Sequence, residues 1–274
     1  MKTMRLPANY YQQFDADFSL PVPGEGYGGW KKTEVELSLD HTALVVMHAW
    51  DTGTRERYPG WHRAVEYFQR SDRILRTVFP PLLAAVRASG MKLFHVVSSS
   101  RYCKDYPGYK RAVALAAPSV PALEQIPTDP VLDALRRFRK EHSFVGRDNV
   151  ADVEKGFKDM DFPPEARPVG EEGVAENAAQ LFALCKPDGI NHLIYAGFAI
   201  NWCLLLSPGG MADMSKRGFM CSALKQAVTA VENKDTARKE LCKEIALWRV
   251  ALAFGFVFDV DDFIRGLTVA TKSR

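Results

Sequence analysis

The chain has 274 residues, of which 47% are hydrophobic and 25% are charged, the composition of a soluble globular protein long enough for one large α/β domain. Its formal net charge of +3 is small, so nothing indicates nucleic acid or an anionic membrane as a partner. The sequence has no apolar signal core and no run of roughly 18 apolar residues, and its cysteines form no Cys-x-x-Cys pair, so we expect a reduced, cytoplasmic protein.

The first segment, residues 1–40, is polar and rich in aromatic residues. Prolines and glycines between positions 21 and 29 argue against regular structure there. We therefore expect an N-terminal arm that wraps its own domain or a neighbouring subunit. Residues 41–274 would form the α/β domain.

The first half of that domain predicts a strand, a helix and a second strand. Residues 42–48 form a short apolar run rich in β-branched side chains, typical of a buried strand. Asp72 can cap a helix that ends at Gly90 and is kinked at Pro80 and Pro81. Residues 91–97 form the next strand. Prolines then interrupt residues 100–170, which we interpret as an insertion that serves as a lid or an oligomer contact, with a basic helix over 131–141.

The second half continues the alternation. We expect a helix over 174–185, a buried strand over 192–197 and a helix over 236–252. One face of that last helix carries Leu241, Ile245, Trp248 and Leu252. Strand–helix alternation predicts a parallel sheet with helices on both faces.

Cys203 is the strongest functional candidate. It follows the strand that ends at Gly197 and opens an apolar stretch, so its thiol is expected at the carboxyl edge of the sheet, where ligands bind in open α/β folds. A helix that began at Cys203 would favour its thiolate. The alternative is that Cys203 is a small buried hydrophobic residue.

Gly197, Ala199 and Cys203 match a Gly-x-Ala-x-x-x-Cys pattern, and with the strand order above this resembles the isochorismatase-like cysteine hydrolase superfamily over roughly two thirds of the chain. The resemblance implies a three-layer α/β/α fold around a central parallel sheet of about six strands, the last two of which would start near 216–219 and 254–259. It also implies a Cys nucleophile, an Asp base after the first strand, and a Lys from a later loop. A cis Phe198–Ala199 bond would turn the Ala199 N–H, beside that of Cys203, toward an oxyanion.

Two positions depart from that family pattern. The Asp position falls on His48, which could still pair with the thiol, with Asp51 to orient it. Alternatively, His48 only satisfies a strand-end hydrogen bond and the activity is lost. The Lys falls either on Lys140, before Ser143 and Phe144, or in the loop 167–171, which holds no lysine. The second alignment is favoured because it leads directly to the next helix and strand.

These residues predict a hydrolase of an amide or related C–N bond in a small molecule. The alternative is a catalytically inactive small-molecule-binding or scaffold protein on the same fold. Trp50, Phe198 and Trp202, with Asp51, are candidate substrate-binding residues. The alternative is that the three aromatic residues are ordinary members of the core. His-x-His spacing is absent, so we expect no metal and no cofactor. The aromatic arm and the insertion favour a homo-oligomer.

Overall fold

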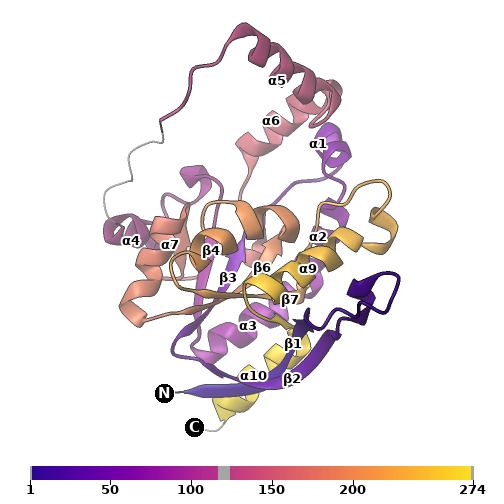
Figure 1. Ribbon diagram of the computed structural model, residues 1–274. Helices are drawn as coiled ribbons and strands as arrows, with labels where there is room; N and C mark the ends of the chain where they lie inside the picture. Colours follow the sequence, from indigo (N-terminus) through magenta and orange to yellow (C-terminus); the bar gives the residue numbers. More distant parts are fainter. Residues whose placement is uncertain (1, 117–123, 273–274) are drawn as a thin grey trace.

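The computed structural model describes residues 2–116 and 124–272. Eight strands form one sheet in the order β2-β1-β8-β7-β6-β3-β4-β5 (Figure 1). Strands β3 to β8 pair in parallel, whereas β1 runs antiparallel to both β2 and β8. The strands are β1 (Thr3–Gln12), β2 (Gly29–Ser38), β3 (Thr42–Met47), β4 (Lys92–Val96), β5 (Gly173–Ala175), β6 (His192–Phe198), β7 (Met220–Thr229) and β8 (Val257–Phe258).

Helices cover both faces of this sheet, which gives the expected three layers. Side chains of α2, α3 and α10 pack on one face, and those of α4, α7, α8 and α9 pack on the other. None of the helices in the described part of the chain is long and apolar enough to cross a membrane. The helices are α1 (Pro59–Ala64), α2 (Phe68–Thr77), α3 (Phe79–Ser89), α4 (Pro107–Leu115), α5 (Pro130–His142), α6 (Val150–Asp159), α7 (Ala178–Cys185), α8 (Met211–Ser215), α9 (Leu241–Ala253) and α10 (Val260–Lys272).

The expectation of an irregular arm was wrong for most of residues 1–40. Strands β1 and β2 form a long hairpin whose register runs from Thr3 opposite Ser38 to Gln12 opposite Gly29. Met4, Leu6 and Ala8 alternate with more exposed residues and are buried, and β1 packs against α10. The prolines and glycines that argued against regular structure lie mainly in the connection between the strands. The alternation of buried and exposed residues in β1 therefore predicts its structure better than the proline and glycine content of the segment does.

The helix predicted to end at Gly90 is in fact two helices. Helix α2 ends at Thr77 and α3 begins at Phe79, with Pro80 in the first turn of α3, where its missing N–H costs no hydrogen bond. Gly90 ends α3 in a left-handed conformation, as predicted. Asp72 lies inside α2, where it accepts a hydrogen bond from Arg76 at 2.9 Å and does not act as the cap.

Two further boundaries differ from the sequence prediction. Residues 173–175, which the sequence assigned to a helix, form β5 and complete a set of six parallel strands, β3 to β8. Helix α7 begins only at Ala178, and the Asn177 side chain before it accepts from the Gln180 N–H at 3.0 Å. On α9 the buried residues are Ala246, Leu247 and Val250. Three of the four apolar residues noted on its other face are exposed, namely Leu241, Ile245 and Leu252.

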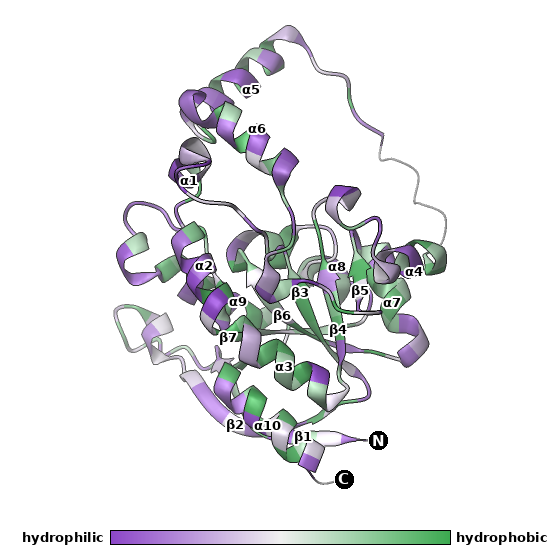
Figure 2. Cartoon of the chain, turned by 180° about the vertical axis from the view of Figure 1, so that it is seen from behind, coloured by the Kyte–Doolittle hydropathy of each residue, from purple (hydrophilic) through white to green (hydrophobic). Residues whose placement is uncertain are grey.

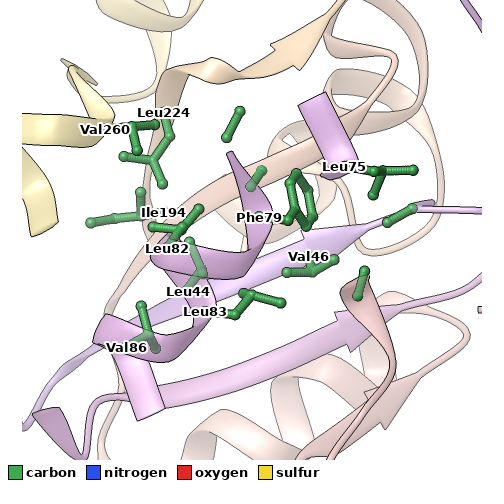
Figure 3. Packing of buried hydrophobic residues seen from close by; sticks show 14 of the residues in the cluster. Leu44, Val46, Leu75, Phe79, Leu82, Leu83, Val86, Ile194, Leu224 and Val260 are labelled. Carbon is green, nitrogen blue, oxygen red and sulfur yellow. The ribbon is translucent and has the colours of Figure 1, made fainter. Parts of the chain in front are cut away.

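The core on one face of the sheet is built around α3. Phe79, Leu82 and Val86 on this helix lie against Leu44 of β3 and Ile194 of β6 (Figure 3). All of these side chains are at most 1% exposed, and full burial of such a side chain contributes about 1.5–3 kcal/mol. The apolar centre and polar periphery are visible in Figure 2. This packing fixes the positions of the strands whose ends carry the candidate site.

Helices α5 and α6 of the insertion project from one end of the molecule (Figure 1). Figures 1 and 2 show α5, α6 and α1 together beyond the sheet, and α6 packs against α1. Helix α5, predicted as a basic helix over 131–141, has no buried residue. Lys140 lies near its end and pairs with Glu154 of α6 at 3.2 Å in an exposed ion pair.

A substitution at Gly197 tests how closely β6 approaches β3. Its φ is +124°, and a Cβ there would lie 1.9 Å from the Met47 carbonyl oxygen. Gly197→Ala should lower the free energy of unfolding by about 3 kcal/mol or more, because the backbone clash adds to the dihedral cost. Gly90 is the control, since its φ is +79° but nothing lies within 4 Å of a Cβ, so Gly90→Ala should cost only about 1–2 kcal/mol. Equal losses in urea unfolding would contradict this packing.

Candidate functional site

The candidate site lies where β3, β4 and β6 end. Met47 pairs with both Gly197 of β6 and Val96 of β4, so the residues that follow leave the sheet side by side at its carboxyl edge. The His48 N–H donates to the Val96 carbonyl oxygen at 2.9 Å. The parallel register therefore places His48 beside the segment that leads from β6 to Cys203. This edge is where open α/β sheets bind ligands.

Cys203 lies on a tight turn directly after β6. The Phe198–Ala199 bond is cis, as the family resemblance implied. Residues Ile200–Leu204 then form a π-helical turn in which the N–H groups of Trp202 and Leu204 donate to the Ala199 carbonyl oxygen at 3.1 and 3.2 Å. The amides of Ala199 and Cys203 are not donors in these two bonds. Cys203 lies within this π-helical turn and not at the N-terminus of an α-helix, where the sequence had placed it.

The exposure of Cys203 distinguishes it from most other cysteines in the chain. Its side chain is partly exposed, whereas Cys103, Cys185 and Cys221 are fully buried. Burial raises the pKa of each of those three thiols to about 12. Cys242 is also partly exposed, but its Sγ lies 3.3 Å from the Thr236 hydroxyl. Cys203 is therefore not fully buried, although it packs in part against the core.

His48 is held in an unusual environment. Its φ is +50°, its side chain is buried, and its ring stacks on Trp50 with centroids 5.0 Å apart. Burial lowers the pKa of the imidazole to about 4, so it is neutral at pH 7. Its Nδ1 has no hydrogen-bond partner. No hydrogen bond joins His48 to Cys203 in the residues that the structure describes, so the hydrogen-bonded pair expected from the sequence is not formed.

Asp51 does not orient His48. Its side chain is exposed, and its carboxylate accepts from the Gly53 N–H at 2.9 Å. Its own N–H donates to the Asp161 carbonyl oxygen at 2.9 Å. Asp51 thus shapes the loop after β3 and links it to the end of the insertion. The orienting role predicted for it is not supported by this geometry.

The three aromatic candidates have different surroundings. Phe198 is buried in the core and stacks on Phe79 with centroids 6.0 Å apart, so it is a core residue. Trp50 lies edge-on to Phe157 of α6 at 5.8 Å. Trp202 is exposed and lies 6.2 Å from Phe144, just after α5. Aromatic residues of the insertion therefore lie against both tryptophans, which supports the lid interpretation.

Two tyrosines at this edge were missed in the sequence. Tyr67, just before α2, is buried. Burial raises the pKa of its hydroxyl, and the electrostatic effect of Cys203 raises that pKa further. Tyr67 therefore lies near the thiol. Tyr102, after β4, has a buried hydroxyl without a hydrogen-bond partner. No spacing in the sequence connects either tyrosine to a residue more than a hundred positions away.

Neither candidate segment for a lysine supplies one near the thiol. Lys140 pairs with Glu154 on the outer helices, and residues 167–171 contain no lysine. That loop leads to Glu172, which accepts from Arg87 Nε at 2.6 Å and lies 3.0 Å from Nε2 of buried His95. Although burial opposes the shift, the hydrogen bonds from His95, Arg87 and a backbone N–H lower the pKa of Glu172 to about 2. This charged cluster ties α3 to β4.

Comparisons with known proteins give matches in structure only. No protein-family model and no curated protein sequence matches the chain. A cysteine hydrolase from Pseudomonas syringae pv. phaseolicola is 15% identical with a TM-score of 0.50, over 85% of this chain and 95% of that one. An isochorismatase family protein from Burkholderia thailandensis is 14% identical with a TM-score of 0.47, over 85% of this chain and 97% of that one.

The match to the Pseudomonas protein extends over most of both chains, but its low identity means that it shows the fold alone. The observed architecture agrees, with parallel strands, helices on both faces and the cysteine turn at the carboxyl edge. The chain therefore has the isochorismatase-like α/β/α fold that its sequence resembles.

Proposed function

We propose that the protein is a cysteine hydrolase that cleaves an amide or related C–N bond of a small molecule, with Cys203 as the nucleophile. The observation that carries this proposal is the placement of Cys203, a partly exposed residue, on the turn after β6, at the same sheet edge as a buried neutral imidazole. A reactive thiol needs access to substrate and a nearby proton acceptor. The buried cysteines lack the first of these.

In the proposed reaction, His48 takes the proton from the Cys203 thiol as the sulfur attacks the carbonyl carbon. The C–N bond then breaks, and the amine leaves with the proton held by His48, which produces a thioester. Water gives a proton to His48 and attacks the thioester, and the acid is released as the thiol is restored. Catalytic hydrogen bonds are often long in a resting enzyme, so His48 would approach the sulfur only in the substrate complex.

The tetrahedral intermediate requires donors for its oxyanion. The N–H groups of Ala199 and Cys203 are the proposed donors, and one such donor is typically worth about 3–4 kcal/mol. Because they belong to the backbone, they remain when the side chains around them change. This would let the site keep part of its catalytic power without the lysine.

The second candidate is a binding protein that has lost catalysis. It is favoured by the lack of a hydrogen bond between His48 and Cys203 in the described residues and by the low pKa of His48. A base with a pKa of about 4 is a weak proton acceptor at neutral pH. The two candidates differ in whether the thiol turns over a substrate.

Replacement of Cys203 separates these functions. With a panel of small primary amides and ureido compounds, Cys203→Ala should lower kcat/KM by about 1000-fold or more, as expected for loss of a covalent nucleophile. Cys242→Ala is the matched control, because Cys242 is the other partly exposed cysteine, and it should retain activity within about twofold. Unchanged turnover in Cys203→Ala would exclude the thiol as nucleophile, and a wild-type protein inactive on the whole panel would favour the binding protein.

The pH dependence of kcat/KM tests His48 as the base. A base must be unprotonated to act, and burial lowers the pKa of His48 from 6.5 to about 4. Activity should therefore persist as the pH falls through 6.5 and be lost only near pH 4, with circular dichroism confirming that the protein stays folded. If activity were instead lost near pH 6.5, the proton acceptor would be a group with an ordinary histidine pKa, and His48 would be excluded as the base.

A further inference from the structure

The sheet ends on one side in a long and regular edge strand. Strand β2 is the outermost of the eight strands, and among the described residues it pairs only with β1 (Figure 1). Its ten residues contain no proline, and its register with β1 runs from Gly29 to Ser38 without a bulge. Most proteins shorten or interrupt an edge strand, because its unpaired N–H and C=O groups attract another strand. The opposite edge follows that rule, since β5 has only three residues.

The side chains of β2 are open over most of its length. Residues 30–34 and Glu36 are exposed, and Val35 is only half-buried. Neither Lys31 nor Glu34 has an ion-pair partner among the residues that the structure describes. The strand therefore offers both its backbone and its side chains to a partner.

The charges on β2 are separated by sign along the strand. Lys31 and Lys32 precede Thr33, and Glu34 and Glu36 follow it. A second copy of β2 that pairs in parallel would place like charges side by side, and like charges opposite one another are destabilising. A copy that pairs antiparallel places the positive half of each strand beside the negative half of the other. The charge pattern is therefore complementary to itself in the antiparallel direction.

Two-fold symmetry limits the register of such a pair. Opposite residues of an antiparallel pair face the same side of the sheet, so the symmetry axis must pass through a residue and not between two residues. An axis at Lys32 or at Glu34 would set that side chain opposite its own copy. An axis at Thr33 sets Lys32 opposite Glu34 of the second copy in both directions, and it pairs threonine with threonine, which is a favourable cross-strand pair.

This register agrees with the contacts that β2 already makes. Lys32 is held by two aspartates of its own chain, at 2.9 and 3.2 Å. Glu34 of the second copy therefore joins a charge network and does not form an isolated pair. On the other side of the sheet, the aliphatic stem of Lys31 lies over Val35 of the second copy, which packs on the core but stays half-buried in one chain.

We infer that β2 is a self-association surface, at which two copies of the chain pair antiparallel about Thr33 and join their sheets into one. The main-chain hydrogen bonds of an added strand supply the attraction, and the side chains set the register. This surface is independent of the proposed hydrolase. Strands β1, β8 and β7 lie between β2 and the strand that leads to Cys203, so each chain keeps its own candidate site.

Sedimentation velocity tests the surface. The wild type should be mainly dimeric at about 100 μM, a high concentration chosen because one strand pair is a small interface. Glu34→Lys sets two lysines opposite each other on both sides of the axis and should raise the dissociation constant about tenfold or more. Glu25→Lys is the matched control, because Glu25 is exposed and lies in the connection outside β2. It should dimerise within about twofold of the wild type.

Cross-linking tests the register, in a Cys203→Ala, Cys242→Ala background that removes the two partly exposed thiols. Thr33→Cys should form an intermolecular disulfide under mild oxidation, because opposite Cβ atoms lie about 4.5–5.5 Å apart. Lys31→Cys is the control on the same side of the strand. Its two copies would be about 14 Å apart along the paired strands, so it should not cross-link.

Three results would overturn the inference. The first is a wild-type protein that stays monomeric at this concentration. The second is a dimer that Glu34→Lys leaves intact. The third is cross-linking by Lys31→Cys as fast as by Thr33→Cys. Circular dichroism shows whether Glu34→Lys is folded, and if it is not, the two cysteine variants decide alone.

Discussion

The close approach of β6 to β3 at Gly197 is the constraint on which the site depends. The backbone of Gly197 lies so near the Met47 carbonyl oxygen that even one added carbon cannot fit. This contact aligns the ends of the two strands, and His48 follows one end while the turn to Cys203 follows the other. A thiol and an imidazole more than 150 positions apart in the sequence thereby share one edge of the sheet.

Around that edge, the side chains differ from those of the family pattern that the sequence resembles. A neutral histidine stands where an acid is expected, and neither candidate segment brings a lysine to the thiol. The charged groups nearby are engaged elsewhere, with Glu172 paired to Arg87 and His95. Aromatic side chains of the insertion lie against Trp50 and Trp202 at this edge.

The fold was predictable because buried strands and their order leave strong signals in the sequence. The apolar runs at residues 42–47 and 192–197, and Gly90 at a helix end, were placed well. The hairpin of residues 3–38 was missed because prolines and glycines in its loop obscured the alternation in β1. Strand β5 was assigned to a helix because three residues are too few to show a period.

The site was predictable only where one local segment carries it. Cys203 and the turn before it lie within seven residues of Gly197, so a pattern could find them. Tyr67, Tyr102 and Phe157 reach the site through tertiary packing, and no local pattern marks them. The sequence did not reveal that Phe198 packs in the core or that Asp51 bonds to Gly53 instead of His48, because it does not show which way a side chain points. The most direct test of the central claim is peptide mass spectrometry of the wild-type protein after brief exposure to p-nitrophenyl acetate. The account predicts an acetyl group on Cys203 that is lost with time, whereas acetylation that spares Cys203 or favours Cys242 would contradict it.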